Sequence, residues 1–197
     1  MKRRLYILSG LFLFSLFSNG QIKNYPGNRN FPLILTLQFH ALSFPFKDIL
    51  ANFSNPGIGI STELGYDSRQ RWLQQLGVLW YRNRNSGSGI LIMTEIVWRP
   101  VITGGFYGEI KTGLGYDFLF HPVESYRPVN GNWVSKGRNG KGVLTILVGI
   151  SAGYEQFTGA GSVSPFVSYQ FLLLKDYNNS IPLLPETLLQ AGAGVHF

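Results

Sequence analysis

Charged side chains recur at alternate positions in several segments of this 197-residue chain. On the more polar side of these segments lie Glu63, Glu95, Arg99, Glu109, Lys111, Asp117 and Glu155. Such a set could form salt bridges, carry protons or ions, or supply a catalytic carboxylate. No nucleophile accompanies the carboxylates at a recognisable spacing. We therefore expect a network in which each carboxylate is paired with Lys or Arg.

The three histidines raise a different possibility, a Ser–His hydrolase or acyltransferase. That mechanism needs both groups within hydrogen-bond reach and a third group to orient the base. His40 and Ser43 are three positions apart, so on an extended strand they face opposite sides. His121 and Ser125 lie in one predicted loop, where Glu124 could orient the histidine. Their spacing, however, matches no pattern typical of a Ser–His catalytic site. An enzyme is therefore the alternative interpretation.

Other chemical signatures are missing from the sequence. It has no cysteine, and three scattered histidines fall short of a metal-ligand motif. The G-x-G pairs lie inside predicted strands and not in a phosphate-binding loop. Lys and Arg number 17 against 10 Asp and Glu, but the first four residues hold three of the basic ones. The remaining residues carry 14 basic against 10 acidic side chains, a net charge of +4, which is weak evidence for a nucleic-acid partner. From these observations together we expect no metal, no cofactor and no nucleic-acid partner.

The N-terminus has the pattern of a secretory signal peptide. A basic start precedes an apolar run from Leu5 to Phe17, and small residues follow at Ser18-Asn19-Gly20. The run is short for a membrane span, which makes a retained anchor the less favoured alternative. We expect three parts: a cleaved signal peptide (1–20), a periplasmic N-terminal segment (21–30) and a single folded domain (31–197).

Eight segments alternate apolar and polar residues with a period of two, which indicates β-strands. The clearest runs from Phe106 to Phe120. The predicted strands span residues 33–41, 57–66, 72–81, 90–99, 106–120, 144–155, 166–173 and 189–197. Most are long enough for a tilted strand to cross a bilayer, whereas no apolar run after the signal reaches the roughly 18 residues of a membrane helix.

The predicted connections alternate between short and long. Residues 67–71, 100–105 and 156–164 are short turns, residues 43–56, 121–141 and 175–186 are long loops, and only 82–89 departs from the rule. Short turns at one end and long loops at the other are typical of an outer-membrane barrel. An even number of strands then places both chain ends on the short-turn, periplasmic side.

Aromatic residues on the apolar faces predict two girdles, as in a membrane barrel. Tyr66, Trp72, Trp98, Phe106 and Tyr154 are expected at the periplasmic interface, and Trp80, Tyr116 and Phe118 at the outer one. A soluble β-sandwich would explain the alternation but not these girdles. We therefore predict an all-β protein, an eight-stranded antiparallel up-and-down transmembrane β-barrel.

The predicted outer loops carry candidate contact residues. Loop 43–56 includes Phe44, Phe46 and Phe53 and is too apolar for a plain solvated tip. Loop 121–141 combines Trp133 with Arg127, Lys136 and Arg138, and could contact lipopolysaccharide phosphates or a partner protein. A solvated loop with a Gly-rich hairpin is an equally open interpretation. Residues 180–187 add a second proline-containing apolar piece in the last loop.

With its C-terminal GAGVHF, the sequence resembles small outer-membrane barrels of the OmpA-transmembrane/OmpX-like type across residues 31–197. The resemblance implies that the barrel-assembly machinery recognises Phe197 and Val195, although Val195 replaces the usual aromatic residue. It also implies residence in a Gram-negative outer membrane, among lipid and lipopolysaccharide. Eight strands leave a lumen that side chains fill. The expected role is structural or accessory, with other outer-membrane proteins as partners; the alternative is a lipid A deacylase or acyltransferase.

Overall fold

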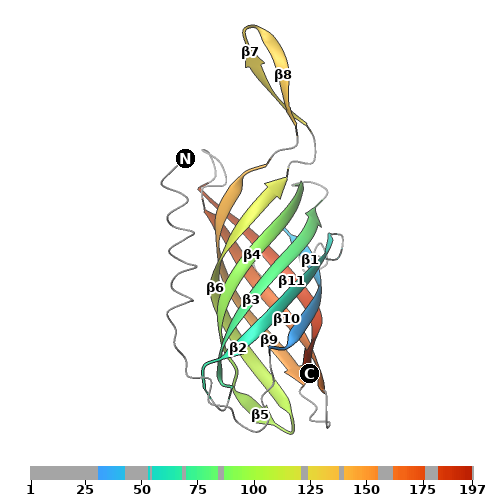
Figure 1. Cartoon of the computed structure of the whole chain (residues 1–197), viewed down its shortest axis with the longest axis vertical. Coiled ribbons are helices and arrows are strands. Elements are labelled where there is room, and N and C mark those ends of the chain that lie inside the picture. Colours follow the sequence, from blue (N-terminus) through green and yellow to red (C-terminus); the bar gives the residue numbers. More distant parts are fainter. Residues whose placement is uncertain are drawn as a thin grey trace.

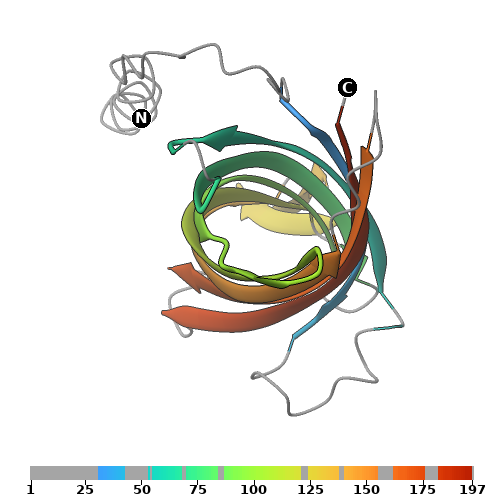
Figure 2. The ribbon, with the colours of Figure 1, turned by 90° about the horizontal axis from the view of Figure 1, so that it is seen from below.

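The computed structural model shows a closed antiparallel β-barrel of eight strands (Figures 1 and 2). It describes residues 31–42, 53, 55–67, 70–83, 87–120, 124–137, 140–154, 162–175 and 182–196. The barrel strands are β1 (Leu33–Ala41), β2 (Pro56–Gly65), β3 (Trp72–Asn83), β4 (Gly87–Trp98), β6 (Phe106–Phe120), β9 (Gly142–Tyr154), β10 (Ser162–Lys175) and β11 (Leu183–His196). Among the described residues, no helix is long and apolar enough to cross a membrane.

The barrel closes where the first strand meets the last. β1 pairs antiparallel with both β2 and β11, so Leu37 lies opposite Ile58 on one side and Ala191 on the other. On the far side, β4 pairs directly with β6. Every barrel strand therefore has a paired neighbour on both sides. β1 starts at the same lower end of the barrel at which β11 finishes (Figure 1).

The strands bury one face and expose the other, with the polarity of a soluble protein reversed. On β4, Ile92 and Ile96 point outward and are 50% and 52% exposed, while Glu95 points into the lumen and is fully buried. β2 follows the same rule: Ile58 and Ile60 face outward, and Glu63 faces inward. Apolar side chains thus cover the outside of the barrel, as expected for strands in contact with lipid.

Three further strands lie in the connections. β5 (Val101–Thr103) pairs with the start of β6 through a turn at Gly104-Gly105, where both residues have positive φ. The prediction of a plain turn over 100–105 is thus replaced by a short hairpin. β7 (Ser125–Val129) and β8 (Asn132–Gly137) form a second hairpin that projects beyond the upper end of the barrel (Figure 1).

The turn between β7 and β8 explains this second hairpin. Asn130 and Gly131 have φ angles of 50° and 79°. Asn-Gly tolerates positive φ at both central positions, and such a turn matches the twist of the strands it joins. The described part of residues 121–141 therefore forms a hairpin, which is compatible with either interpretation of this segment.

The last strand begins six residues earlier than predicted, at Leu183 and not at Leu189. Pro185 hides this start, because proline usually marks the end of a strand. Above the pair Ala41–Thr187, however, β11 has β10 as its neighbour and no longer pairs with β1. A proline is tolerated on such an edge because it has no N–H to leave unpaired. Most of residues 180–187 therefore belongs to a strand and not to an apolar loop.

Inward-facing glycines make room for large side chains on the neighbouring strands. A Cβ at Gly89 would lie 2.3 Å from the ring of Tyr81, and one at Gly153 would lie 2.3 Å from the hydroxyl of Tyr107. A Cβ at Gly192 would approach the ring of Phe166 to 2.7 Å. These glycines are a packing requirement of the filled lumen.

We expect Gly89→Ala to destabilise the barrel, because the added methyl group collides with the buried ring of Tyr81. The free energy of unfolding should fall by about 1–3 kcal/mol, measured by urea unfolding of protein refolded in lipid vesicles. Gly108→Ala is the matched control, since its Cβ would meet its nearest neighbour at 3.8 Å. It should change stability by no more than about 0.5 kcal/mol. Equal effects of the two substitutions would contradict this account of the lumen.

Candidate functional site

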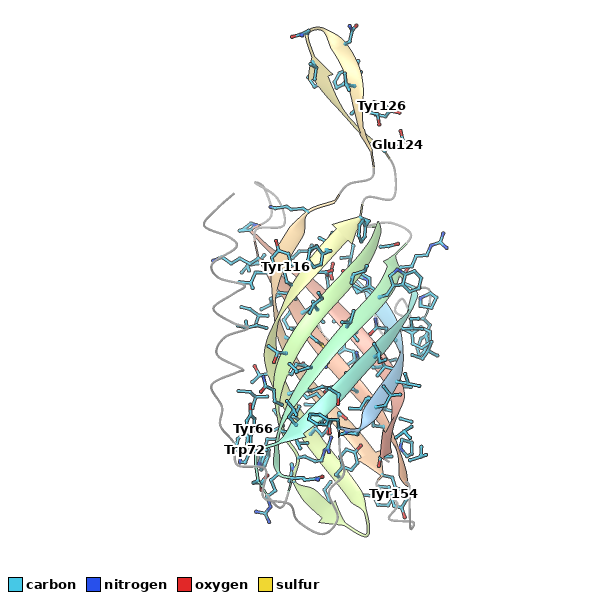
Figure 3. The ribbon with its side chains drawn as sticks, viewed as in Figure 1. Tyr66, Trp72, Tyr116, Glu124, Tyr126 and Tyr154 are labelled. Carbon is cyan, nitrogen blue, oxygen red and sulfur yellow. The ribbon has the colours of Figure 1, made fainter. Side chains whose placement is uncertain are left out.

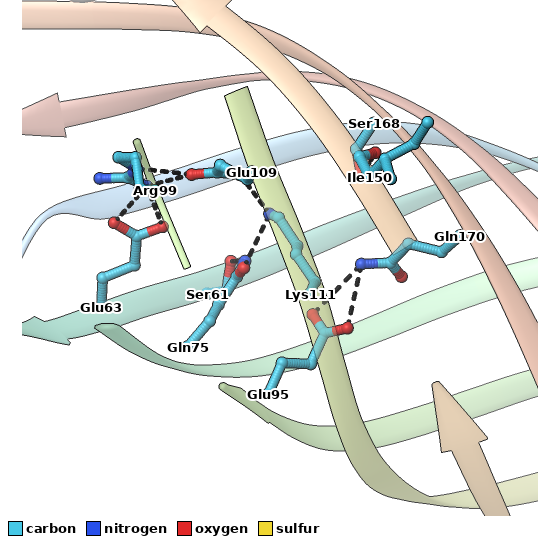
Figure 4. A network of polar contacts seen from close by, with 10 residues as sticks. All are labelled: Ser61, Glu63, Gln75, Glu95, Arg99, Glu109, Lys111, Ile150, Ser168 and Gln170. Atoms are coloured by element: carbon cyan, nitrogen blue, oxygen red, sulfur yellow. Dashed lines mark hydrogen bonds and ion pairs between the residues drawn. The ribbon is translucent and has the colours of Figure 1, made fainter. Parts of the chain in front are cut away.

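A cluster of paired charges lies in the part of the lumen next to the lower end of β4. Figure 4 shows its contacts. Arg99, just after β4, donates from Nη2 to both carboxylate oxygens of Glu63 on β2, at 2.7 and 2.8 Å. Its Nε donates to Oε1 of Glu109 on β6 at 2.6 Å. The Arg99 side chain is only 13% exposed. One guanidinium thus neutralises two carboxylates from strands that are not neighbours.

Lys111 extends this cluster along β6. Its Nζ lies 2.9 Å from Oε2 of Glu109 and donates to Oε1 of Gln75 at 3.0 Å. Gln75 in turn donates to the hydroxyl of Ser61 at 2.9 Å. Lys111 is buried, so each of these contacts replaces water that the ammonium group has lost.

Aromatic rings complete the surroundings of the two cations. The guanidinium carbon of Arg99 lies 4.9 Å from the centre of the Tyr107 ring, and Nζ of Lys111 lies 5.4 Å from that of Phe166. Both distances are within the range of cation–π attraction. The space left among the described side chains around Arg99 and Lys111 is about 20 Å³, enough for about one water molecule.

Glu95 also faces the lumen, but its hydrogen bonds are with Gln170 and not with Arg99 or Lys111. Nε2 of Gln170, on β10, is 3.2 Å from each oxygen of the Glu95 carboxylate. A second amide contact joins Gln190 to Gln38 at 3.2 Å. The Glu95–Gln170 contact joins β4 to β10 across the lumen, whereas Gln38 and Gln190 lie opposite each other on the adjacent strands β1 and β11.

An apolar layer interrupts the polar lumen above these contacts. It consists of Leu79, Leu91, Met93, Val143, Leu147, Leu172, Leu174 and Leu188. On β3, Leu79 separates Gln75 from Tyr81, and on β11, Leu188 separates Gln190 from Glu186. The sequence predicts one charge-filled lumen. The lumen instead holds two polar clusters with a hydrophobic core between them.

The upper cluster contains Asp117, which therefore lies apart from Arg99 and Lys111. The hydroxyl of Tyr81 donates to Asp117, and the Tyr81 ring stacks on His40 at 4.4 Å between ring centres. Nε2 of His40 lies 2.9 Å from Oε2 of Glu186. All four side chains are buried.

Glu186 is absent from the predicted network because the sequence predicts a loop over residues 175–186. The sequence does hold a signal for Glu186. Residues an even number apart on a strand face the same side, and Glu186 precedes the inward-facing Gln190 by four residues on β11. Glu155, the seventh residue of the predicted network, lies outside the described residues.

The residues predicted for the girdles lie at the two ends of the outer surface (Figure 3). At the lower end, Trp72 pairs across strands with Trp98, and the rings of Phe106 and Tyr154 are 4.9 Å apart. Tyr66 lies at this end as well. Towards the upper end, Trp80 and Phe118 are both opposite Ile90, and Phe118 lies 5.0 Å from Tyr116. Most of these rings are exposed on the outside of the barrel.

The predicted contact residues of the outer loops are only partly described. Phe53 is exposed, and its ring lies 5.0 Å from that of Phe39 on β1. Arg127 is on β7, whereas Trp133, on β8, is 73% exposed, and Lys136 is also on β8. Phe44, Phe46, Arg138 and Phe197 lie outside the described residues; Val195 is on β11, opposite Leu33 and Val163.

Another structural feature of the outer hairpin is a set of hydrogen bonds at its base. Oε2 of Glu124 accepts from the hydroxyl of Tyr126 at 3.2 Å and from the hydroxyl of Ser135 at 3.3 Å. These bonds tie β7 to β8 through side chains. Within the described ranges, no group of three or more His, Asp or Glu side chains is arranged to hold a metal ion.

We expect Arg99→Met to destabilise the barrel strongly, because it removes the cation that Glu63 and Glu109 share. Glu63 is then left without its ion pair, and Glu109 keeps only Lys111. Removing one member of a buried ion pair costs about 3–5 kcal/mol in the free energy of unfolding, again measured with urea in lipid vesicles. Arg71→Met, at an exposed arginine just before β3 and so at the same end of the barrel, serves as control. It should cost less than about 0.5 kcal/mol. If both substitutions are harmless, the lower charge cluster does not stabilise the protein.

Comparison with known proteins links this geometry to membrane barrels. No protein-family model and no curated protein matches the sequence. The crystal structure of Neisserial surface protein A (NspA) matches with a TM-score of 0.51 and 11% identity, over 85% of this chain and 97% of NspA. A de novo designed transmembrane β-barrel matches with a TM-score of 0.49 and 10% identity, over 89% of this chain and 100% of the design. The N-terminal barrel of Pseudomonas aeruginosa OprF matches with a TM-score of 0.46 and 12% identity, over 84% and 97%. The likeness to NspA, together with the closed eight-stranded sheet, shows that this chain has the fold of a small outer-membrane β-barrel.

Proposed function

We propose that this protein is a non-enzymatic, integral component of a Gram-negative outer membrane with a structural or accessory role. The observation that carries this proposal is the predominantly apolar outer surface that the eight strands form between two aromatic girdles. Such a surface is stable in lipid and would aggregate in water. The expected signal peptide agrees with export, and the last strand with Val195 and Phe197 would be the element that the assembly machinery recognises.

The packed lumen supports a role other than passage of solutes. Paired charges fill its lower part, and leucines fill the layer above them. An eight-stranded barrel is just wide enough for side chains to fill it. The function therefore lies on the outside of the barrel and on its outer connections.

The outer hairpin is the element best suited to contact another molecule. β7 and β8 project beyond the barrel, and Tyr126 and Trp133 are largely exposed there (Figures 1 and 3). Residues 121–141 contain four Lys or Arg and a single Glu. Exposed aromatic residues and arginine are frequent anchors of protein interfaces, and positive charge favours anionic partners. Lipopolysaccharide and another outer-membrane protein both fit, and Phe53 would add apolar surface from loop 43–56.

The lipid A deacylase or acyltransferase alternative is not favoured. His40 faces the lumen, is fully buried and contacts Glu186, so it has no access to lipid. A general base must reach the proton it removes. The proposed function therefore assigns His40 to the packing of the upper cluster.

We expect the accessory role to be visible by affinity purification in mild detergent. The intact protein should recover neighbouring outer-membrane components in stoichiometric amounts. The double variant Tyr126→Ser, Trp133→Ser should lose them, because the hairpin then lacks its exposed rings, while it still migrates as a heat-modifiable barrel. Recovery of no neighbour by the intact protein would argue for a free-standing barrel and against an accessory role.

The non-enzymatic role predicts an unchanged lipid A in cells that make or lack the protein. Mass spectrometry of extracted lipid A should show the same acyl pattern in both. A gain or loss of one acyl chain that depends on the protein would overturn the proposed function in favour of the enzyme.

A further inference from the structure

The upper cluster of the lumen holds two buried carboxylates without a Lys or Arg beside them. It consists of His40 on β1, Tyr81 on β3, Asp117 on β6 and Glu186 on β11, all of which are at most 1% exposed. In the described part of the chain, neither carboxylate lies within ion-pair distance of a Lys or Arg side chain. The lower cluster differs, because two cations lie against its carboxylates.

The neighbouring strands add no charge to the upper cluster. The residues that lie opposite its four members in the cross-strand register are Gly57, Gly89, Leu91, Val143, Leu172 and Leu188. None of these can ionise. Lys141 precedes β9 at the upper rim, but its side chain is exposed to water. Among the described residues, the charges that act on Asp117 are therefore those of Glu186 and His40.

The histidine of this cluster lies against only one of the two carboxylates. Nε2 of His40 is 2.9 Å from Oε2 of Glu186, so a protonated His40 balances that carboxylate. Oδ2 of Asp117 instead accepts a hydrogen bond from the neutral hydroxyl of Tyr81. Oδ1 of Asp117 is buried and has no hydrogen-bond partner. Asp117 is thus a buried acid without a cation of its own.

An ionised Asp117 would be costly in these surroundings. An unpaired charge that has lost its water costs far more free energy than an unpaired neutral hydroxyl group. The like charge of Glu186 adds repulsion to that cost. A proton on Oδ1 removes both terms, and it leaves Oδ2 as a carbonyl oxygen that accepts from Tyr81.

We propose that the upper cluster is a proton-binding site, in which Asp117 holds the proton in the folded barrel. The hydroxyl of Tyr81 positions the carboxyl group, and the pair of His40 and Glu186 supplies the neighbouring charges. Release of the proton to water leaves two like charges buried at the end of the barrel from which the outer hairpin projects. The inference depends on the packing of the lumen and goes beyond the role proposed above.

Infrared spectroscopy of the protein refolded in lipid vesicles tests the proposal directly. The carbonyl stretch of a protonated carboxyl group is separate from the bands of a carboxylate. At neutral pH, the native protein should show such a band that Asp117→Asn lacks. Asp67→Asn is the matched control, because the Asp67 carboxylate accepts N–H bonds from Arg71 and Trp72 at a turn. It should leave the band unchanged.

A second variant ties the band to the contact with Tyr81. In Tyr81→Phe, the band should move to higher frequency, because the carbonyl oxygen of Asp117 loses its hydrogen-bond donor. A band that keeps its frequency or disappears in this variant would overturn the proposal. This measurement uses a barrel that retains Asp117, so it does not depend on the folding of Asp117→Asn.

The bound proton also makes stability depend on pH. The unfolded chain loses the Asp117 proton above about pH 5, whereas the folded barrel keeps it, so a rise in pH favours unfolding. From there to the pH at which the infrared band disappears, the unfolding equilibrium constant of the native protein should rise relative to that of Asp117→Asn. The expected rise is up to about tenfold per pH unit, measured with urea in lipid vesicles. A ratio independent of pH would contradict the proposal.

The remaining outcomes separate this inference from the proposed function. A protonated band that persists in full in Asp117→Asn belongs to another carboxyl group, such as that of Glu95, and overturns the inference. Absence of any protonated band from a heat-modifiable native barrel overturns it as well. Neither result bears on the proposed function, which the affinity purification and the lipid A spectra test.

Discussion

Backbone hydrogen bonding in a medium without water is the constraint on which the rest of this structure depends. Each peptide group within the lipid must find a partner in the protein, which excludes an open sheet edge. The contacts of β1 with β11 and of β4 with β6 meet this condition by closing the sheet. Closure divides the side chains into those that face lipid and those that face the lumen, and both the stability and the function follow from that division.

The lumen of a closed eight-stranded barrel is small and largely excludes water, so its charges must pair with one another. Arg99 is shared by Glu63 and Glu109, and Lys111 by Glu109 and Gln75. Large side chains need space, which glycines on the adjacent strands provide. The apolar layer above them adds hydrophobic packing to a barrel whose outer face gains little from it in lipid.

The fold was largely predictable, whereas the lumen was predictable only as a list of residues. The alternation in Phe106–Phe120 placed Glu109, Lys111 and Asp117 on the inner face, as the structure has them. Their partners could not be predicted in the same way, because Asp117 meets Tyr81 and not the lysine on its own strand. The early start of β11 was missed because whether Pro185 needs an N–H depends on the neighbouring strand, which the local sequence does not show.

The sequence by itself determined that the chain forms strands, how many cross the membrane and which face of each is apolar, because a period of two is a local property. The turn at Asn130-Gly131 is also a local feature, because the tolerance of Asn and Gly for positive φ is a property of the residues themselves. Only the tertiary structure decided which charges share a cation and that leucines divide the lumen. Those arrangements depend on the stagger between strands, which is set when the barrel closes and joins residues far apart in the chain.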